Sequence, residues 1–171
     1  MNIVITGQKG LAKALANAYS NHTVTCISRS SGHDINFVND WAHNFFSADM
    51  LINCAHSEYA QTKVLEYFVS AWQNDSTKKI INIGSKVTDY LRSESEKQNE
   101  YFSYKNQKQS LQNAFANMVD NCLCDVRLYN LGPIETDLIA HLNVPKMSPT
   151  TASEHIKLLN SLPNLKRVDL W

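Results

Sequence analysis

The sequence has no excess of charge of either sign, because 16 lysines and arginines balance 16 aspartates and glutamates. No basic block stands out either, so the electrostatic footprint of a protein that binds nucleic acid or an anionic membrane is missing. Nothing approaches the roughly 20 consecutive apolar residues of a membrane-spanning helix. The apolar run IVIT has no basic lead-in and stops at Gly7, which is too short for a signal peptide. These absences predict a cytoplasmic protein that binds neither nucleic acid nor membrane.

Cysteine is scarce, with single residues at 26, 54, 122 and 124. Three of the four fall in apolar, strand-like runs, where a reduced cysteine behaves as a small hydrophobic residue. We therefore expect buried, free thiols. The six histidines are scattered singly, without the short Cys/His spacing that a metal site requires, and we predict no metal site.

Short apolar runs alternate with amphipathic stretches along the chain. Runs rich in isoleucine and valine predict buried strands at residues 2–6, 23–28, 49–55, 79–85 and 124–131. Helices are expected at about 11–20, 37–47, 60–73, 101–120 and 149–161, before a last short strand at 167–171. This alternation predicts an α/β fold, a Rossmann-like three-layer sandwich with a doubly wound parallel sheet. The length favours one domain over residues 1–171.

A glycine turn, ITGQKGLAKALA, joins the first predicted strand to the first helix. Gly7 and Gly10 make the turn tight, and the helix follows with Leu11 in its first turn. Because glycine has no side chain, a pyrophosphate can approach the backbone and bind the free N–H groups at the helix N-terminus. In the first strand-to-helix turn of an α/β chain, this pattern predicts a dinucleotide site.

The end of the second predicted strand lacks the acid that an NAD-selective site usually carries for the ribose 2′-hydroxyl. It reads ISRSS instead. A planar guanidinium binds phosphate oxygens in a bidentate way, so Arg29, with Ser28 and Ser30 beside it, suits a 2′-phosphate. Lys9 could add a second positive charge. Either side chain alone could be a solvated loop residue, but together they predict that NADP(H) is preferred over NAD(H).

The pattern Tyr-x-x-x-Lys occurs twice, as Tyr101/Lys105 and as Tyr104/Lys108. On a helix, the second pair shares a face with apolar residues that begin at Leu111, so this pair must point toward the core. The first pair has no apolar anchor. Tyr101 is therefore interpreted as a residue of the first helical turn, and the second pair as the candidate for chemistry.

Reducing a carbonyl requires a proton for the developing alkoxide, and a phenol can supply it if a nearby positive charge lowers its pKa. We predict that Tyr104 donates this proton and that Lys108, one turn away, lowers the pKa of Tyr104. Ser85 ends a predicted strand at the edge where ligands bind in open α/β sheets, so its hydroxyl can donate to the substrate oxygen. The alternative is a core tyrosine and a serine that caps a loop.

These features together resemble the short-chain dehydrogenase/reductase family. TGQKGLA is similar to that family's glycine motif with one residue deleted and Ala12 in place of the last glycine. Asp34 stands where the family has an aspartate near the adenine ring. NCAH resembles the family's Asn-Asn-Ala-Gly segment, which implies cofactor contacts for Asn53, Cys54 and Ala55.

Two further segments extend the resemblance. INIGS resembles the strand that ends in the family's catalytic serine, which gives that role to Ser85. LGPIET resembles the segment beside the nicotinamide, which implies cofactor contacts for Gly132, Pro133, Ile134 and Thr136, with Thr136 orienting the carboxamide. The family's active-site helix aligns with the second tyrosine–lysine pair, and the lysine there also holds the nicotinamide ribose.

The resemblance runs from residue 2 to about 138, but the family's substrate loops are mostly missing. About five residues separate NCAH from the next helix, so Gln61 or Thr62 lies near the place of the family's catalytic asparagine. Residues 137–150 remain as a short substrate lid.

The resemblance implies an NADP(H)-dependent oxidoreductase that interconverts a small carbonyl compound and its alcohol through Tyr104, Lys108 and Ser85. A dinucleotide-binding protein without turnover, a sensor or a structural subunit, is the alternative. A nucleotide-sugar epimerase or dehydratase would use the same tyrosine–lysine pair, but no C-terminal domain is large enough to hold a sugar nucleotide.

Family members commonly pair through the two helices that flank the serine-bearing strand, here 60–73 and 101–120. This implies a homodimer or homotetramer. Tyr67, Phe68 and Trp72 could form such an interface, although an ordinary core face explains them equally well.

Overall fold

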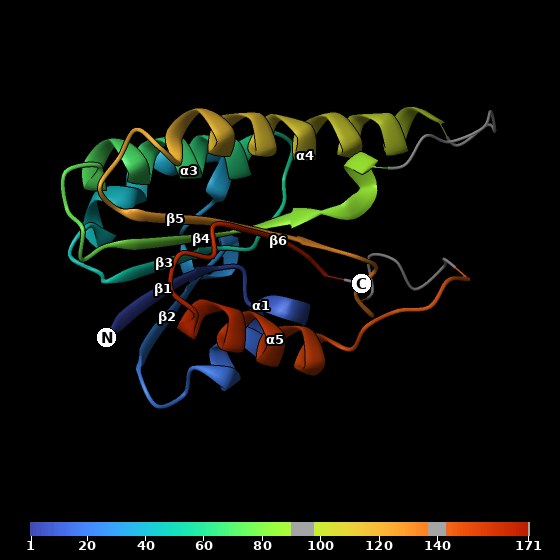
Figure 1. Ribbon diagram of the computed structural model, residues 1–171, viewed down its shortest axis with the longest axis horizontal. Helices are drawn as coiled ribbons and strands as arrows, with labels where there is room; N and C mark the ends of the chain where they lie inside the picture. Colours follow the sequence, from blue (N-terminus) through green and yellow to red (C-terminus); the bar gives the residue numbers. More distant parts are fainter. Residues whose placement is uncertain (90–97, 137–142, 171) are drawn as a thin grey trace.

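Six parallel strands form one sheet with helices on both faces (Figure 1). The structure, a computed structural model, describes residues 1–89, 98–136 and 143–170. The strands are β1 (Asn2–Thr6), β2 (Thr23–Ile27), β3 (Met50–Asn53), β4 (Lys79–Ser85), β5 (Asp125–Leu131) and β6 (Arg167–Leu170). The helices are α1 (Gly10–Ala18), α2 (Val38–Trp41), α3 (Ala60–Trp72), α4 (Gln98–Met118) and α5 (Pro149–Ser161).

The strand order is β2-β1-β3-β4-β5-β6, and each neighbouring pair is parallel. The chain therefore builds the sheet outward from β1 in two directions. A crevice is expected outside the carboxyl end of β1, because the connections after β1 and β3 leave the sheet toward opposite faces. This is the doubly wound arrangement predicted from the sequence.

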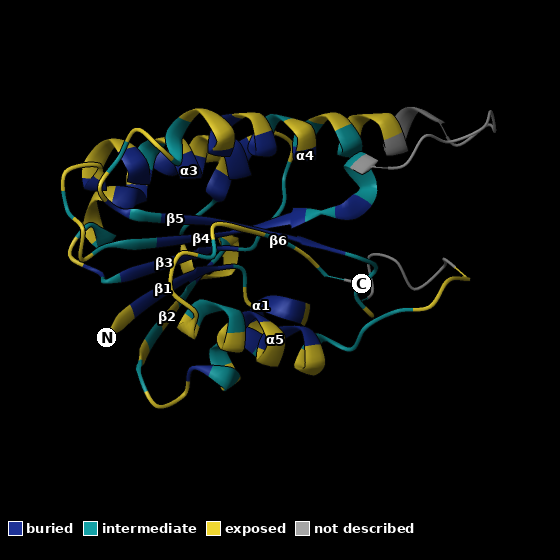
Figure 2. Cartoon of the chain, in the orientation of Figure 1, coloured by how far each residue is buried: buried dark blue, intermediate teal, exposed yellow. Residues whose placement is uncertain are grey.

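Helices α3 and α4 cover one face of the sheet, and α1 and α5 cover the other (Figure 1). Successive strand residues point to opposite faces, so Leu51 and Ile80 pack beneath α3 and α4, whereas Ile52 and Ile81 pack against α1 and α5. Figure 2 shows the central layer buried and the outer helix surfaces exposed. The strands have near-continuous apolar runs because both of their faces are covered.

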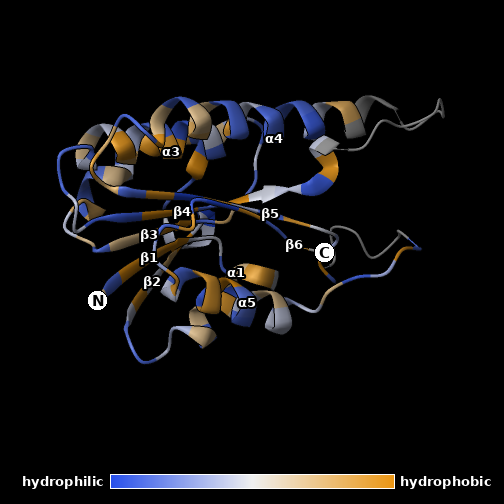
Figure 3. Ribbon diagram, viewed as in Figure 1, coloured by the Kyte–Doolittle hydropathy of each residue, from blue (hydrophilic) through white to orange (hydrophobic). Residues whose placement is uncertain are grey.

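Helix α4 is largely hydrophilic in Figure 3, yet it carries an inward stripe. Lys108, Leu111 and Phe115 are all buried, as the helical spacing predicts. The helix begins at Gln98, three residues before the expected start. The backbone of Tyr101 therefore lies in its first turn, while its side chain lies outside the described part.

The helix expected at 37–47 is shorter than predicted. Only Val38–Trp41 is α-helical, and tight 3₁₀ turns precede and follow it. The ring centroids of Trp41 and Phe46 lie 6.2 and 5.5 Å from that of Phe68 on α3. Packing of wide aromatic side chains against one helix surface determines the path of the chain here, and it outweighs the local helical periodicity.

Two residues suggested for a subunit interface belong to the core. Phe68 and Trp72 are 0% and 2% exposed, so the core alternative is the right one for them. Tyr67 is partly buried and stacks on Phe46.

The four cysteines are free, as predicted, but only Cys124 is fully buried. Cys26 lies on the edge strand β2, Cys54 follows the last residue of β3, and Cys122 precedes β5, so the surrounding layers cover these three only in part. Among the residues that the structure describes, no cluster of His, Cys, Asp or Glu could hold a metal ion. Over the same residues, no helix has the length and apolarity to cross a membrane.

Candidate active site at the carboxyl edge of the sheet

The glycine turn after β1 has the backbone geometry that glycine permits. Gly7 and Gly10 have φ angles of +102° and +50°. A Cβ atom at Gly7 would lie 3.1 Å from the Cβ of Ala12, and one at Gly10 would lie 3.1 Å from the Cγ2 of Thr136. Both glycines therefore have a left-handed backbone conformation, and the side chains of Ala12 and Thr136 leave no room for a larger residue. Thr136 lies beside this turn although more than a hundred residues separate it from Gly10.

The N-terminus of α1 is free to receive an anion. Lys9 occupies the N-cap position without a side-chain hydrogen bond, and the first turn of this helix contains no acidic residue. Its N–H groups and helix dipole therefore favour negative charge. The Leu11 side chain is buried in the core, so only its backbone belongs to this site.

A pocket of about 170 Å³ opens between the glycine turn, the end of β2 and the segment after β3. Its lining includes Gly7, Arg29, Asp34, Ala55 and His56. Lys9 is not part of the lining. With Ser28, which also lines it, the pocket brings together five of the residues expected at a cofactor, and two histidines that were not among them, His33 and His56.

Hydrogen bonds between serines hold the turn that carries Arg29. The Ser28 N–H donates to Ser31 Oγ at 2.9 Å, Ser28 Oγ lies 2.8 Å from Ser30 Oγ, and Ser30 Oγ donates to Gln8 Oε1 at 2.9 Å. Arg29 itself is exposed, and no ion pair joins it to a carboxylate of the described chain. The serines fix the turn, and Arg29 is exposed at the wall of the pocket.

Asp34 is similarly fixed by its own neighbourhood. Its Oδ1 atom accepts from the Asn36 N–H at 3.0 Å and from Asn36 Nδ2 at 2.9 Å, and its carbonyl accepts from Trp41 Nε1 at 2.8 Å. The carboxylate is therefore held at the pocket wall.

The segment after β3 is tied to β1 through a buried threonine. Thr6 Oγ1 accepts from the N–H groups of Cys54 and Ala55, at 2.8 and 2.9 Å. Ala55 lines the pocket, but Asn53 does not: its side chain is buried, and Nδ2 donates to the Gln61 carbonyl at 2.8 Å and to Asn82 Oδ1 at 3.0 Å. Burial raises the pKa of the Cys54 thiol to about 12.

Ser85, Tyr104 and Lys108 come together from the end of β4 and the buried face of α4. Ser85 lies close enough to the Tyr104 phenol to lower its pKa against the effect of burial. Lys108 is 3% exposed, and its Nζ lies 5.6 Å from the centroid of the Tyr104 ring. Nζ donates to Gln61 Oε1 at 2.7 Å and to the Ile83 carbonyl at 3.1 Å.

The predicted lowering of the Tyr104 pKa is wrong for this structure. Burial raises the pKa of Tyr104, and the nearby Ser85 side chain only opposes this. The ammonium of Lys108 lies over the ring and directs N–H groups to Gln61 and Ile83 instead of to the phenol oxygen. Burial also lowers the pKa of Lys108 to about 8. Desolvation is therefore the largest cause of both pKa shifts, in place of the attraction between charges that was expected.

His56 is the residue that sequence reasoning missed. Its ring lies 4.8 Å from the Tyr104 ring, edge to face, and its Nδ1 is buried without a hydrogen-bond partner. Burial, and then the charge of Lys108, lower the pKa of His56 to about 4, so the imidazole is neutral near pH 7. Its position directly after a buried strand was the available signal.

The segment after β5 folds back over the glycine turn. The Gly132 N–H donates to the Leu170 carbonyl at 2.7 Å. Pro133 O accepts from the Met147 N–H at 2.9 Å, the Glu135 N–H donates to Met147 O at 2.8 Å, and Ile134 bridges Met147. This pairing carries the chain to Thr136, beside Gly10. Of the expected lid at 137–150, residues 137–142 lie outside the described part.

No protein-family model matches this sequence, and no curated protein sequence matches it. Among solved structures, a short-chain dehydrogenase from Burkholderia cenocepacia in complex with NADP is 20% identical, with a TM-score of 0.76 over 98% of this chain and 86% of that chain. The chain has the fold of the short-chain dehydrogenases. An alcohol dehydrogenase from the archaeon Thermococcus sibiricus, complexed with 5-hydroxy-NADP, is 15% identical, with a TM-score of 0.75 over 99% of this chain and 95% of the other.

A 3-alpha-hydroxysteroid dehydrogenase from a Pseudomonas species, complexed with NADH, shares the fold with 16% identity and a TM-score of 0.66, over 99% of this chain and 94% of that chain. Structures of this fold thus hold either NADP or NADH. The fold does not determine the choice between NADP(H) and NAD(H), which depends on the residues that face the ribose 2′ position.

Proposed function

We propose that this protein is an NADP(H)-dependent oxidoreductase that interconverts a small carbonyl compound and its alcohol. The observation that carries the proposal is the meeting of three side chains: the buried Lys108 ammonium lies 5.6 Å from the centroid of the Tyr104 ring, and Ser85 ends β4 close enough to the phenol to affect its pKa. This group lies at the same sheet edge as the glycine turn and its pocket, which is where ligands bind in open α/β sheets.

The residues at this edge fit a dinucleotide. The left-handed Gly7 and Gly10 and the uncapped N-terminus of α1 suit a pyrophosphate. Arg29 at the pocket would bind a 2′-phosphate, and Asp34 lies where the adenosine end would sit. A reduced nicotinamide, when bound, supplies the hydride.

The side chains of this chain would then handle the proton. Ser85 Oγ donates a hydrogen bond to the substrate oxygen, and the Tyr104 hydroxyl gives its proton to the alkoxide that forms there. Because burial raises the pKa of Tyr104, the phenol stays protonated at neutral pH. A protonated phenol is an acid ready to donate, which favours carbonyl reduction over alcohol oxidation at that pH.

A dinucleotide-binding protein without turnover is the second candidate. The observation that favours it is the His56 imidazole against the Tyr104 ring, since this ring stands where the resembling family has a glycine and takes up space beside the phenol. The two functions differ in what the Tyr104 hydroxyl is needed for.

Titration with NADPH and, separately, NADH tests the cofactor site through nicotinamide fluorescence. We expect NADPH to bind at least about tenfold more tightly, a difference of about 1.4 kcal/mol. Arg29→Gln should remove most of this difference, whereas Arg167→Gln, a change of an exposed arginine on β6, should preserve it. If neither nucleotide binds, the oxidoreductase proposal is abandoned.

The variant Tyr104→Phe separates the enzyme from the binder. Turnover of a panel of aldehydes and ketones with NADPH should fall by about 10²- to 10⁴-fold while nucleotide affinity is kept, because only the proton donor is lost. Tyr67→Phe, on α3 and away from the site, is the matched control. A wild-type protein that binds NADPH but turns over no member of the panel supports the second candidate.

A further inference from the structure

Gln61 lies where β3 and β4 separate. The paired register of these strands ends at Asn53 and Asn82. Beyond it, the side-chain amide of Gln61 meets the main chain of both strands: Nε2 donates to the Asn53 carbonyl at 2.7 Å and to the Ile83 carbonyl at 2.8 Å. Gln61 is 2% exposed, so this amide replaces the strand pairing inside the protein.

These two bonds set the direction of the amide. A glutamine side chain has two N–H donors on Nε2 and one carbonyl oxygen. With both donors directed to strand carbonyls, Oε1 must point the other way, and Lys108 Nζ donates to it at 2.7 Å. Within the described part of the chain, the one further acceptor for Nζ is the Ile83 carbonyl at 3.1 Å. Over the described chain, Lys108 forms no ion pair with a carboxylate.

We propose that Gln61 is a positioning residue for Lys108: it anchors its amide to the two diverging strands and presents Oε1 to the buried ammonium, which it orients and keeps charged. Its effect on turnover rests on the proposed function, whereas its effect on Lys108 does not. Gln61 acts only through this lysine, since its amide is fully used by Asn53, Ile83 and Lys108.

The other groups around Lys108 do not replace this contact. Cys54 faces the lysine from the end of β3, but burial raises the pKa of its thiol to about 12, so it carries no charge near pH 7. His56 is neutral there and Tyr104 presents its ring. Burial lowers the pKa of Lys108 to about 8, close enough to neutrality for the loss of one strong acceptor to change its charge.

The test is an NMR titration of the Lys108 side-chain amine in ¹⁵N-lysine protein without added nucleotide, with Lys108→Met used to assign its signal. Gln61→Met should lower the pKa of Lys108 by about one pH unit, since hydrogen bonds to charged groups are the stronger ones. Gln112→Met is the matched control, because Gln112 is also buried, lies one turn further along α4, and bonds Thr88 and Asn130 instead of the lysine. In Gln112→Met, the pKa of Lys108 should equal that of the wild type.

If Gln61→Met does not fold, Gln61→Asn keeps the amide but shortens its reach, and the same downward shift is expected. An unchanged Lys108 pKa in the Gln61 variant, or an equal shift in Gln112→Met, overturns the proposal. In an active enzyme, the limb of the kcat/KM pH profile that reports Lys108 should move with the NMR value. A wild type without turnover would contradict the proposed function, while the NMR result would still decide the role of Gln61.

Discussion

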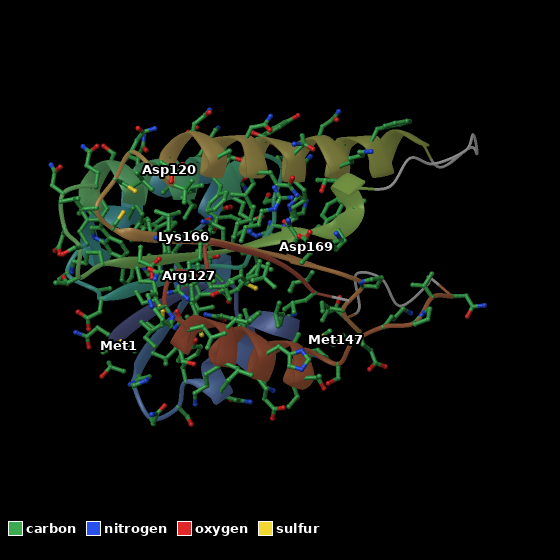
Figure 4. The ribbon with its side chains drawn as sticks, in the orientation of Figure 1. Met1, Asp120, Arg127, Met147, Lys166 and Asp169 are labelled. Atoms are coloured by element: carbon green, nitrogen blue, oxygen red, sulfur yellow. The ribbon has the colours of Figure 1, made fainter. Side chains whose placement is uncertain are left out.

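Two buried cations at opposite edges of the sheet, Arg127 and Lys108, are 4% and 3% exposed but have opposite kinds of partner. At the amino edge, Asp125 lies 2.8 Å from Arg127, 2.9 Å from Lys166 and 3.3 Å from Lys79. Figure 4 shows Arg127 and Lys166 close together, with Asp169 farther along β6. Burial alone would raise the pKa of Asp125, but hydrogen bonds from Arg127 and Lys166 outweigh it and lower the pKa to about 2.

At the carboxyl edge, the hydrogen-bond partners of Lys108 among the described residues are both neutral oxygens, Gln61 Oε1 and the Ile83 carbonyl. Among the described residues, three buried polar atoms have no partner: Asn53 Oδ1 and His56 Nδ1 at this edge, and Asn160 Oδ1 near Arg127. Buried polar groups left in this condition cost free energy. The comparison teaches that the amino edge neutralises its buried cation with a carboxylate, whereas at the carboxyl edge the hydrogen bonds of Lys108 within the described chain go to neutral oxygens beside a pocket that His56 lines.

The largest effect on stability is expected from Arg127→Met. It removes the buried partner of Asp125 and the donor to the carbonyls of Leu159, Asn160 and Leu162 at the end of α5. The free energy of unfolding should fall by about 3–5 kcal/mol in denaturant titrations, with NADPH affinity unchanged. Lys166→Met, at a half-exposed partner of the same carboxylate, should cost less than about 1 kcal/mol. Equal losses in the two variants would contradict this account.

Lys108, in contrast to Arg127, should lower the free energy of unfolding at neutral pH, and this cost should disappear as the pH rises. Its pKa of about 8 lies below the ordinary 10.5, so between these pH values the unfolded chain holds a proton that the folded chain has lost. Stability should therefore rise with pH through this window, by up to about 3 kcal/mol. Urea unfolding of the wild type minus that of Lys108→Met measures the rise. The variant should be at least as stable as the wild type at pH 7, and a clear loss there would show that the lysine stabilises the fold.

His56 should act at the acid end. Its pKa of about 4 lies below the ordinary 6.5, so the unfolded chain takes up a proton first as the pH falls, and stability should decline between pH 6.5 and 4. Because the ring is partly exposed, we expect roughly 2 kcal/mol. His56→Phe keeps the ring contact with Tyr104 and should lack this decline. Asp125, with its pKa lowered to about 2, should contribute only below about pH 4, so a loss that persists in the variant would contradict the assignment.

The smallest effect on stability is expected at the glycines. Gly10→Ala and Gly32→Ala each place a side chain at positive φ, at +50° and +80°, which should cost about 1 kcal/mol in each case. An added Cβ at Gly10 meets Thr136, whereas one at Gly32 meets nothing within 4 Å. Only Gly10→Ala should therefore weaken NADPH binding, measured by fluorescence titration. Equal affinities in the two variants would separate the glycine turn from the cofactor.

Several parts of the site were predictable because their signals are local. Isoleucine- and valine-rich runs and the Gly7/Gly10 turn follow from short-range patterns, and the inward direction of Lys108 follows from helical spacing to Leu111. The helix expected at 37–47 failed in part because contacts with Phe68, outside that segment, determine how the chain winds there.

Periodicity was thus sufficient for the positions of the strands along the chain and for the face on which Tyr104 and Lys108 lie, and the alternation of strands and helices was sufficient for a parallel sheet. The order of the strands in the sheet came from the structure. Periodicity could not predict three features of the site: the rise in the Tyr104 pKa, the contact of the His56 imidazole with the Tyr104 ring, and the contact of Gln61 with Lys108. Each of these depends on desolvation or on atoms that meet across dozens of residues of chain. Such quantities exist only once the sheet and its two helical layers have closed around the site.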